Sequence, residues 1–220
     1  MNKQQTATIL GSTGLIGSHV LKQICDDDDF SSIRLISRRP LSYDHPKLDI
    51  RVIDFEDEGQ FRNAITGSDV VFCAVGTTNK KVDGDKGAYR KVDYDIPVNA
   101  AKYCGESGCE QFLLVSAIGA DSKSNIFYNR LKGEVEEEVA KFGIPSVSIF
   151  QPSMLLGDRD ESRPAERIGQ VLMSAFSFLI PSKYKPIKGS DVAKAMVRAS
   201  KAESQGMHTY AYAGMNELIS

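Results

Sequence analysis

The sequence predicts a doubly wound α/β fold, in which helices cover both faces of one parallel sheet. Short apolar segments alternate with segments of helical spacing through the first 150 residues, an order that is typical of this class. Residues 70–75 are continuously apolar, as expected for a strand that is covered on both faces. A glycine-rich turn separates the first strand from the first helix. Because strands that alternate with helices are joined by crossovers, we expect parallel pairing.

The individual elements follow from the same periodicity. Gly143 and Pro145 mark the end of the longest helix, because glycine suits the position after a helix and proline cannot continue it. Strands are expected at residues 6–10, 33–36, 50–53, 70–75, 111–116 and 146–150, and helices at residues 12–25, 57–65, 94–104 and 127–142. Beyond residue 152 we expect a polar loop over 157–163, an apolar helix to about residue 180, a helix opened by Ser190 and a short strand at 210–213.

Length and composition limit the function classes. The 220 residues fit a single domain, 1–220, to which residues 153–220 contribute a small extension that forms a substrate-side lid. A net charge of −2 gives no basic excess for nucleic acid. The most apolar long stretch, residues 171–180, is shorter than the roughly 20 residues of a membrane span. We therefore expect a soluble, cytoplasmic protein with a small-molecule substrate and no nucleic-acid, membrane or metal partner. A protein partner is left open.

The glycine-rich turn predicts a phosphate site. Its three glycines are spaced three residues apart. In such turns one glycine makes the bend, one lets the backbone approach a pyrophosphate and one lets the helix pack closely on the strand. The amides and dipole of the following helix then face the anion. We expect a dinucleotide to contact Gly11, Ser12, Thr13, Gly14, Leu15, Ile16 and Gly17. The alternative is a glycine turn without a ligand.

The end of the second strand favours NADP(H) over NAD(H). Ser37, Arg38 and Arg39 occupy positions where NAD-binding proteins often carry an acidic residue for the ribose hydroxyl. Two guanidinium groups suit a 2′-phosphate instead, and Ser37 adds a hydroxyl donor. The alternative is a pair of solvated surface arginines.

Two further strand ends fit the same cofactor. Asp54 and Phe55 follow the third strand, where a side chain can reach the adenine. Small residues after the fourth strand would let the backbone approach the cofactor ribose; they are Ala74, Val75, Gly76 and Thr77.

Three residues form a candidate catalytic group. Tyr128 and Lys132 lie four residues apart, on one face of a predicted helix. Ser116 ends the fifth strand, at the edge where parallel sheets bind ligands. A free tyrosine has a pKa of about 10, and a nearby ammonium lowers it. Tyr128 could then exchange a proton with a carbonyl or alcohol oxygen that Ser116 orients, while Lys132 also holds the nicotinamide ribose. The alternative is an aromatic residue and a solvated lysine on a helix surface.

Together these residues resemble the short-chain dehydrogenase/reductase superfamily in its atypical branch, and more narrowly the Tat-interacting-protein-like oxidoreductases. The segment Gly157-Asp158-Arg159-Asp160-Glu161-Ser162-Arg163-Pro164 is the most specific to this group. The resemblance implies a Rossmann fold, NADPH binding and a Ser116, Tyr128, Lys132 site. It also implies cofactor contacts from Gln151, Pro152 and Ser153, although related proteins often carry arginine at position 151. Many dehydrogenases use an asparagine on the fourth helix, where this chain offers Asp93 and Asn99 without a clear equivalent.

The sequence therefore predicts an NADP(H)-dependent oxidoreductase that acts on a carbonyl or alcohol. An NADPH-binding regulatory protein with little catalytic activity is the first alternative, and an epimerase with a tightly held cofactor is the second.

Overall fold

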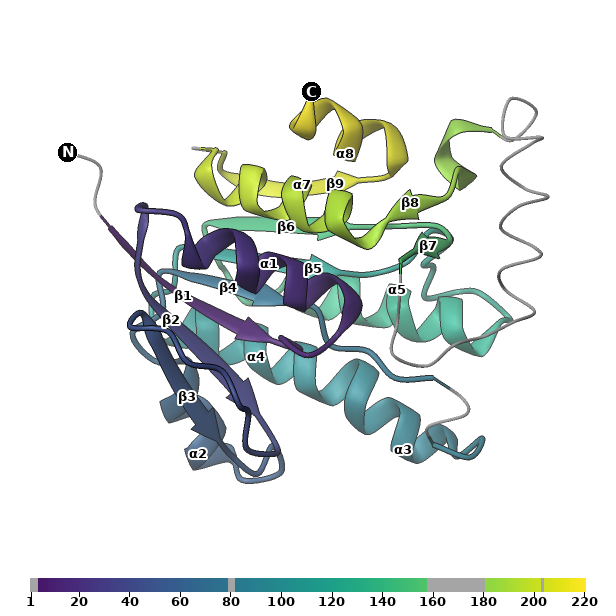
Figure 1. Ribbon diagram of the computed structural model, residues 1–220. Helices are drawn as coiled ribbons and strands as arrows, with labels where there is room; N and C mark the ends of the chain where they lie inside the picture. The colour runs from purple at the N-terminus through teal and green to yellow at the C-terminus, as the bar shows by residue number, and fades with distance from the viewer. Residues whose placement is uncertain (1–3, 79–81, 158–180, 203) are drawn as a thin grey trace.

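The fold is built on one seven-stranded sheet whose neighbouring strands are all parallel. The computed structural model describes residues 4–78, 82–157, 181–202 and 204–220 (Figure 1). The strand order is β3-β2-β1-β4-β5-β6-β9, so the chain reverses its direction of winding between β1 and β4. Ligands bind at such a reversal, outside the carboxyl ends of the strands. The strands are β1 (Gln5–Leu10), β2 (Phe30–Ser37), β3 (Leu48–Val52), β4 (Val70–Cys73), β5 (Gln111–Val115), β6 (Ser146–Phe150) and β9 (Gly206–Tyr210).

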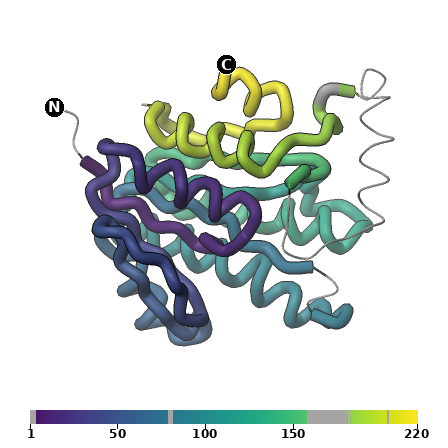
Figure 2. The backbone as a smooth tube through the Cα atoms, viewed as in Figure 1, coloured from purple at the N-terminus to yellow at the C-terminus, as the bar shows by residue number. Residues whose placement is uncertain are grey.

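Helices cover both faces of the sheet, which confirms the predicted doubly wound class. Figure 2 shows α1 (Leu15–Cys25), α7 (Gly189–Lys201) and α8 (Tyr212–Ile219) above the sheet. The opposite face carries α2 (Glu58–Ile65), α4 (Ile96–Glu106) and α5 (Phe127–Val139) (Figure 1). Residues of β4 alternate between the two cores, since Phe72 packs in one and Val71 and Cys73 in the other. This burial on both faces explains the continuous apolar run of that strand.

The third predicted helix is part of a helical segment that begins earlier than its periodicity indicated. A helical segment runs from Lys86 through α3 (Lys86–Arg90), a π-helical turn (Lys91–Asp95) and α4. The sequence predicted a helix only over 94–104. Asp85 begins the segment, because its carboxylate accepts the amides of Gly87 and Ala88 at 2.7 and 3.2 Å.

The C-terminal part of the chain belongs largely to the main layers. Helix α7 packs against α1, and β9 extends the sheet beside β6. The strand predicted at 210–213 is misplaced, because β9 ends at Tyr210 and α8 begins at Tyr212. A two-stranded sheet joins β7 (Leu155–Leu156) to β8 (Ile187–Lys188), and a 3₁₀ turn covers Ser182–Tyr184. The predicted loop over 157–163 and apolar helix fall almost wholly on residues 158–180, outside the described part, and a lid there stays a prediction.

A buried arginine fixes α2 to the sheet. Arg34 of β2 is 8% exposed, and its Nη1 donates to the carbonyl oxygens of Ala64 and Thr66 at 2.8 and 2.9 Å. Its Nε lies 3.4 Å from Asp49 Oδ2. The cation thus satisfies carbonyls at the C-terminal end of α2, where positive charge is favourable.

Within the described ranges, no helix has the length and apolar character needed to cross a bilayer.

Candidate active site

The glycine turn packs against the end of β4 so closely that a side chain is excluded. Gly11 has φ +87°, and a Cβ placed on it would lie 2.6 Å from the carbonyl oxygen of Ala74. A Cβ on Gly17 would lie 2.1 Å from the carbonyl oxygen of Gly11. Both distances are far below van der Waals contact, so these two positions require glycine. The structure therefore brings Gly11, Gly17 and Ala74, three residues of the predicted cofactor set, into one junction.

The first turn of α1 presents backbone amides with no side-chain cap. Gly14 is the N-cap in an extended conformation, and no side chain hydrogen-bonds there. The amide of Gly14 donates to the carbonyl of Gly11 at 2.9 Å, while the helix proper begins at Leu15. Uncapped amides at a helix start are a ready site for phosphate oxygens. The turn and helix start thus have the form that a dinucleotide diphosphate needs.

The loop after β6 and the start of α7 close on the same turn. A Cβ on Gly157 would lie 2.8 Å from Leu15 Cδ1, and one on Gly189 would lie 2.6 Å from Leu15 Cγ. The carbonyl oxygen of Pro152, in the loop after β6, accepts the amide of Ile118 at 3.0 Å. Ser153 Oγ donates to the carbonyl of Lys185, so its proton is engaged in this conformation. The predicted cofactor residues after β6 therefore lie along the same carboxyl edge.

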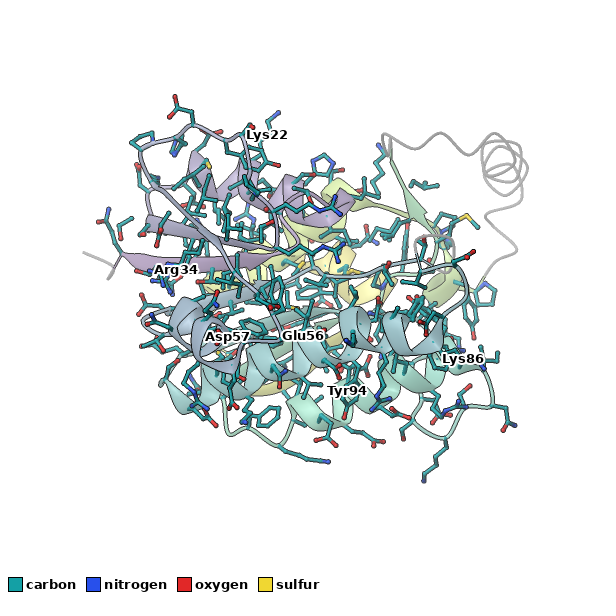
Figure 3. The ribbon with its side chains drawn as sticks, turned by 90° about the horizontal axis from the view of Figure 1, so that it is seen from below. Lys22, Arg34, Glu56, Asp57, Lys86 and Tyr94 are labelled. Atoms are coloured by element: carbon teal, nitrogen blue, oxygen red, sulfur yellow. The ribbon has the colours of Figure 1, made fainter. Side chains whose placement is uncertain are left out.

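A cleft of about 790 Å³ lies between the ends of β2 and β3 and the helical segment α3–α4. It contains Arg38, Asp54 and Phe55, which the sequence predicted to contact the cofactor. Across it, Lys91 Nζ lies 2.6 Å from Glu56 Oε1, and Figure 3 shows Glu56 next to the helical segment of Tyr94. The lining residues are Arg38, Asp54, Phe55, Glu56, Glu58, Val82, Ala88, Lys91, Val92, Asp95, Ile96, Asn99, Lys102 and Tyr103.

The two predicted arginines differ in position. Both side chains are exposed, but Arg38 lines the cleft and Arg39 does not belong to the described lining. Ser37 accepts the backbone amide of Arg39 at 3.2 Å, so this hydroxyl organises the turn after β2. Arg38 is therefore the better placed of the two for an anion in the cleft.

Tyr128 and Lys132 lie at the start of α5 with different exposure. Tyr128 is 39% exposed, whereas Lys132 is 5% exposed. Lys132 Nζ lies 3.0 Å from Asp93 Oδ1. Burial lowers the pKa of Lys132, but Asp93 and then Tyr128 raise it, and the result lies above the ordinary value. The chain thus places a charged ammonium beside an accessible phenol.

Asp93 and Tyr89 are functional candidates to which the sequence interpretation gave no role. Asp93 comes from the π-helical turn and accepts the amide of Thr77 at 2.7 Å. The ring of Tyr89 meets that of Tyr128 edge-on, with centroids 6.5 Å apart. The Tyr89 hydroxyl donates to the Thr77 carbonyl at 3.4 Å. Burial, then Asp93 and Tyr128, raise the pKa of Tyr89, so it stays a neutral phenol. Its ring limits the space on one side of the Tyr128 ring.

Ser116 has a partner that the sequence did not suggest. Its hydroxyl donates to Glu136 of α5, and it is 5% exposed. Gln151 Nε2 donates to both oxygens of Glu136 at 3.0 Å. Gln151 thus contacts a carboxylate, which is also what an arginine at this position could do. The orienting role of Ser116 stays a prediction, and it requires the hydroxyl to leave Glu136.

Comparison with known proteins identifies the family. A family model described as NAD(P)H-binding matches residues 11–145. The chain belongs to this NAD(P)H-binding family. Protein HTATIP2 of Rattus norvegicus is 37% identical over 167 residues, which cover 74% of this chain and 68% of the relative. Protein FMP52, mitochondrial, of Candida albicans is 32% identical over 198 residues, covering 86% and 85%. These relatives confirm the resemblance that the sequence motifs indicated.

Two solved structures share the fold of this chain. The UDP-N-acetylglucosamine 4-epimerase from Methanobrevibacter ruminantium has a TM-score of 0.70 at 16% identity, over 95% of this chain and 77% of that one. MoeE5 in complex with UDP-glucuronic acid and NAD has a TM-score of 0.72 at 15% identity, over 94% and 76%. Both likenesses concern the fold alone, and they confirm the predicted Rossmann architecture.

Proposed function

We propose that this family member is an NADP(H)-dependent oxidoreductase that interconverts a carbonyl group and an alcohol. The observation that carries the proposal is the pairing of an accessible Tyr128 with a buried, charged Lys132. The pair lies at the carboxyl edge of the sheet, where this fold binds its ligands.

The residues divide the chemistry between them. The ammonium of Lys132 stabilises the phenolate form of Tyr128, which lets the phenol release a proton to a carbonyl oxygen. In the opposite direction Tyr128 takes the proton of the alcohol. The amides at the start of α1 would hold the diphosphate, and Arg38, which lines the cleft, would hold a 2′-phosphate there. The bound cofactor would supply or accept the hydride.

Binding of the cofactor is the first test. Calorimetric titration of the folded chain should detect NADPH, with NADH weaker. Arg38→Gln should weaken NADPH binding by about 10-fold or more, the scale of a charge-assisted hydrogen bond, and leave NADH nearly unchanged. Arg39→Gln is the matched control and should change little. Equal losses in both variants would contradict the assignment to Arg38.

Turnover is the second test. Tyr128→Phe should abolish oxidation of NADPH by a carbonyl substrate, with a loss of about 100-fold or more, because the proton donor is removed. NADPH affinity should change by less than about 3-fold, since that affinity comes mainly from the phosphate contacts. Undiminished turnover would refute the catalytic assignment.

The engaged hydroxyl of Ser116 favours a second candidate, an NADPH-binding regulatory protein with little catalysis. While Ser116 donates to Glu136, its proton is not offered to a substrate oxygen. A panel of aldehydes and ketones separates the candidates. NADPH binding without any oxidation across the panel would support the regulatory protein.

The cytoplasmic location is part of the proposal, together with a small-molecule substrate and no nucleic-acid or membrane partner. FMP52 is named as a mitochondrial protein, which makes the mitochondrion the competing compartment. Cell fractionation with compartment markers decides between the two.

A further inference from the structure

Asp93 is a buried charge that the proposed proton transfer does not use. It is 1% exposed, and each carboxylate oxygen has a partner. Oδ1 lies 3.0 Å from Lys132 Nζ, and Oδ2 accepts the amide of Thr77 at 2.7 Å. Burying a carboxylate is costly unless it is paired and hydrogen-bonded. The two contacts offset that cost and join α5 to the loop after β4.

The local backbone explains why Asp93 reaches inward. It lies in the π-helical turn between α3 and α4, and Pro97 follows it by four residues. Proline has no N–H, so the carbonyl of Asp93 has no regular α-helical donor at that position. The helix widens around this point, and such turns are frequent at functional sites. The sequence thus builds a local irregularity that presents one carboxylate to Lys132.

The groups around Lys132 leave Asp93 as its main source of negative charge. Tyr128 comes from the same helix, Cys73 from β4 and Tyr89 from α3. Burial raises the pKa of the Cys73 thiol to about 11, and burial also raises the pKa of Tyr89. Both groups are therefore neutral near pH 7. Burial alone would favour the uncharged amine of Lys132.

We propose that Asp93 is a positioning residue, which keeps Lys132 protonated in its buried site and ties it to the backbone at Thr77. The catalytic consequence rests on the proposed function, because only there does the charge of Lys132 act on Tyr128. The ionisation of Lys132 does not depend on cofactor or substrate, so it can be measured separately.

The decisive experiment follows the ionisation of Lys132 in the full chain by NMR. Lysine labelled with ¹³C at Cε reports loss of the proton, and the Lys132 signal is assigned by its absence from Lys132→Met. Asp93→Asn keeps an oxygen for the Thr77 amide but removes the charge. In that variant Lys132 should lose its proton about 2 or more pH units lower than in the wild type, the scale of an unpaired buried lysine. An unchanged midpoint would overturn the proposal.

The matched control is Glu134→Gln. Glu134 lies on α5 two residues from Lys132, is partly exposed and pairs with Arg90 at 2.7 Å. This substitution also removes one negative charge near Lys132, from the helix of Lys132 itself. It should leave the pH at which Lys132 loses its proton unchanged. A comparable fall in this control would also count against the proposal, because the effect would then follow the net charge of the helix.

A stability measurement covers the case in which Asp93→Asn does not fold. Removing one partner of a buried ion pair leaves the other uncompensated, whereas replacing both does not. The double variant Asp93→Asn/Lys132→Met should therefore unfold at a higher temperature than Lys132→Met alone at pH 7. A double variant no more stable than that single variant would overturn the pairing.

These readouts separate this proposal from the proposed function. If NADPH fails to bind but the Lys132 midpoint falls in Asp93→Asn, the pairing stands and the oxidoreductase proposal fails. If NADPH binds and the midpoint is unchanged, the pairing fails, and the oxidoreductase proposal is then decided by the turnover of the wild type and Tyr128→Phe.

Discussion

Two buried cations, Arg34 in β2 and Lys132 in α5, are held in different ways. They are 8% and 5% exposed. Arg34 donates hydrogen bonds through Nη1 to carbonyl oxygens at the end of α2. Its acidic partner, Asp49, is partly exposed. Lys132 pairs instead with the carboxylate of Asp93, which is also buried. One cation therefore completes a helix end, and the other belongs to an ion pair.

The two cations differ in whether burial can remove their charge. A guanidinium does not lose its proton in proteins, and its several donors suit fixed acceptors. An ammonium can lose its proton when it is buried, so its neighbours decide its state. Lys132 lies beside the accessible Tyr128, whereas the described partners of Arg34 are backbone carbonyls, Ser68 and Asp49. Burial of a charge is therefore not enough to identify the candidate active site. We base that assignment on a titratable side chain, Lys132, next to an exposed one, Tyr128.

The largest expected effect is on stability, from Arg34→Met. It removes the charged donor of the Ala64 and Thr66 carbonyls, while Asp49 keeps its contact with Arg51 at 2.9 Å. We expect a loss of about 3–5 kcal/mol, because two carbonyl oxygens each lose a hydrogen bond from a charged donor, at roughly 1.5–3 kcal/mol apiece. Urea unfolding measures it, and calorimetry should find unchanged NADPH affinity for the fraction that stays folded. A loss below about 1 kcal/mol would show that α2 is held by its apolar contacts instead.

Lys132→Met should lower both stability and turnover, because it leaves the buried carboxylate of Asp93 without its partner and removes a charge next to Tyr128; turnover is therefore compared for the folded fraction. Removing the ammonium takes away the group that stabilises the Tyr128 phenolate. With a carbonyl substrate we expect kcat/KM to fall by about 100-fold or more, which is roughly 3 kcal/mol of transition-state stabilisation. Arg34→Met serves as the control, since its folded fraction should keep wild-type kcat/KM. If both variants lose turnover equally, the distinction between the two cations fails.

The sequence was sufficient for the first six strands of the sheet and for the glycine turn, because their signals are local, whereas β9 was misplaced. The strand of Val70 to Cys73 is apolar on both faces, and Gly11 must be glycine because of its φ and its distance from Ala74. Cleft residues such as Arg38 and Phe55 follow from their places at strand ends. Each of these predictions needed only neighbouring residues and the rule that parallel strands end together.

The missed features depend on contacts between segments distant in sequence. The pairing of Asp93 with Lys132 joins a π-helical turn to α5, and no spacing along the chain indicates it. The partner of Ser116 is Glu136 of α5, 20 residues further along the chain, so no local spacing indicates the contact. Helix α3 was missed because its short segment, Lys86–Arg90, follows a polar loop and gains order from Tyr89 packing on Phe127.

The smallest expected effect concerns the other end of the helix that Arg34 holds. Figure 3 places Arg34 and Asp57 on the same side of the molecule. Asp57 caps α2 and accepts both the backbone amide and the side-chain amide of Gln60, at 3.0 and 2.7 Å.

The backbone hydrogen bond from Gln60, then the side-chain bond, lower the pKa of Asp57. A carboxyl group with a lowered folded-state pKa stabilises the protein above its unfolded pKa of about 4, and this stabilisation disappears as pH falls through the folded-state value. Asp57→Ala should therefore be slightly less stable than the wild type at neutral pH, with the gap closing below about pH 4. Asp57→Asn keeps a capping oxygen without the charge. Its loss of stability at neutral pH should therefore be smaller than that of Asp57→Ala. A gap for Asp57→Ala that stays constant from about pH 7 to pH 2 in thermal unfolding would mean that the cap acts by geometry alone. In that case both ends of α2, and not only the end at Arg34, would be fixed by contacts that do not depend on titration.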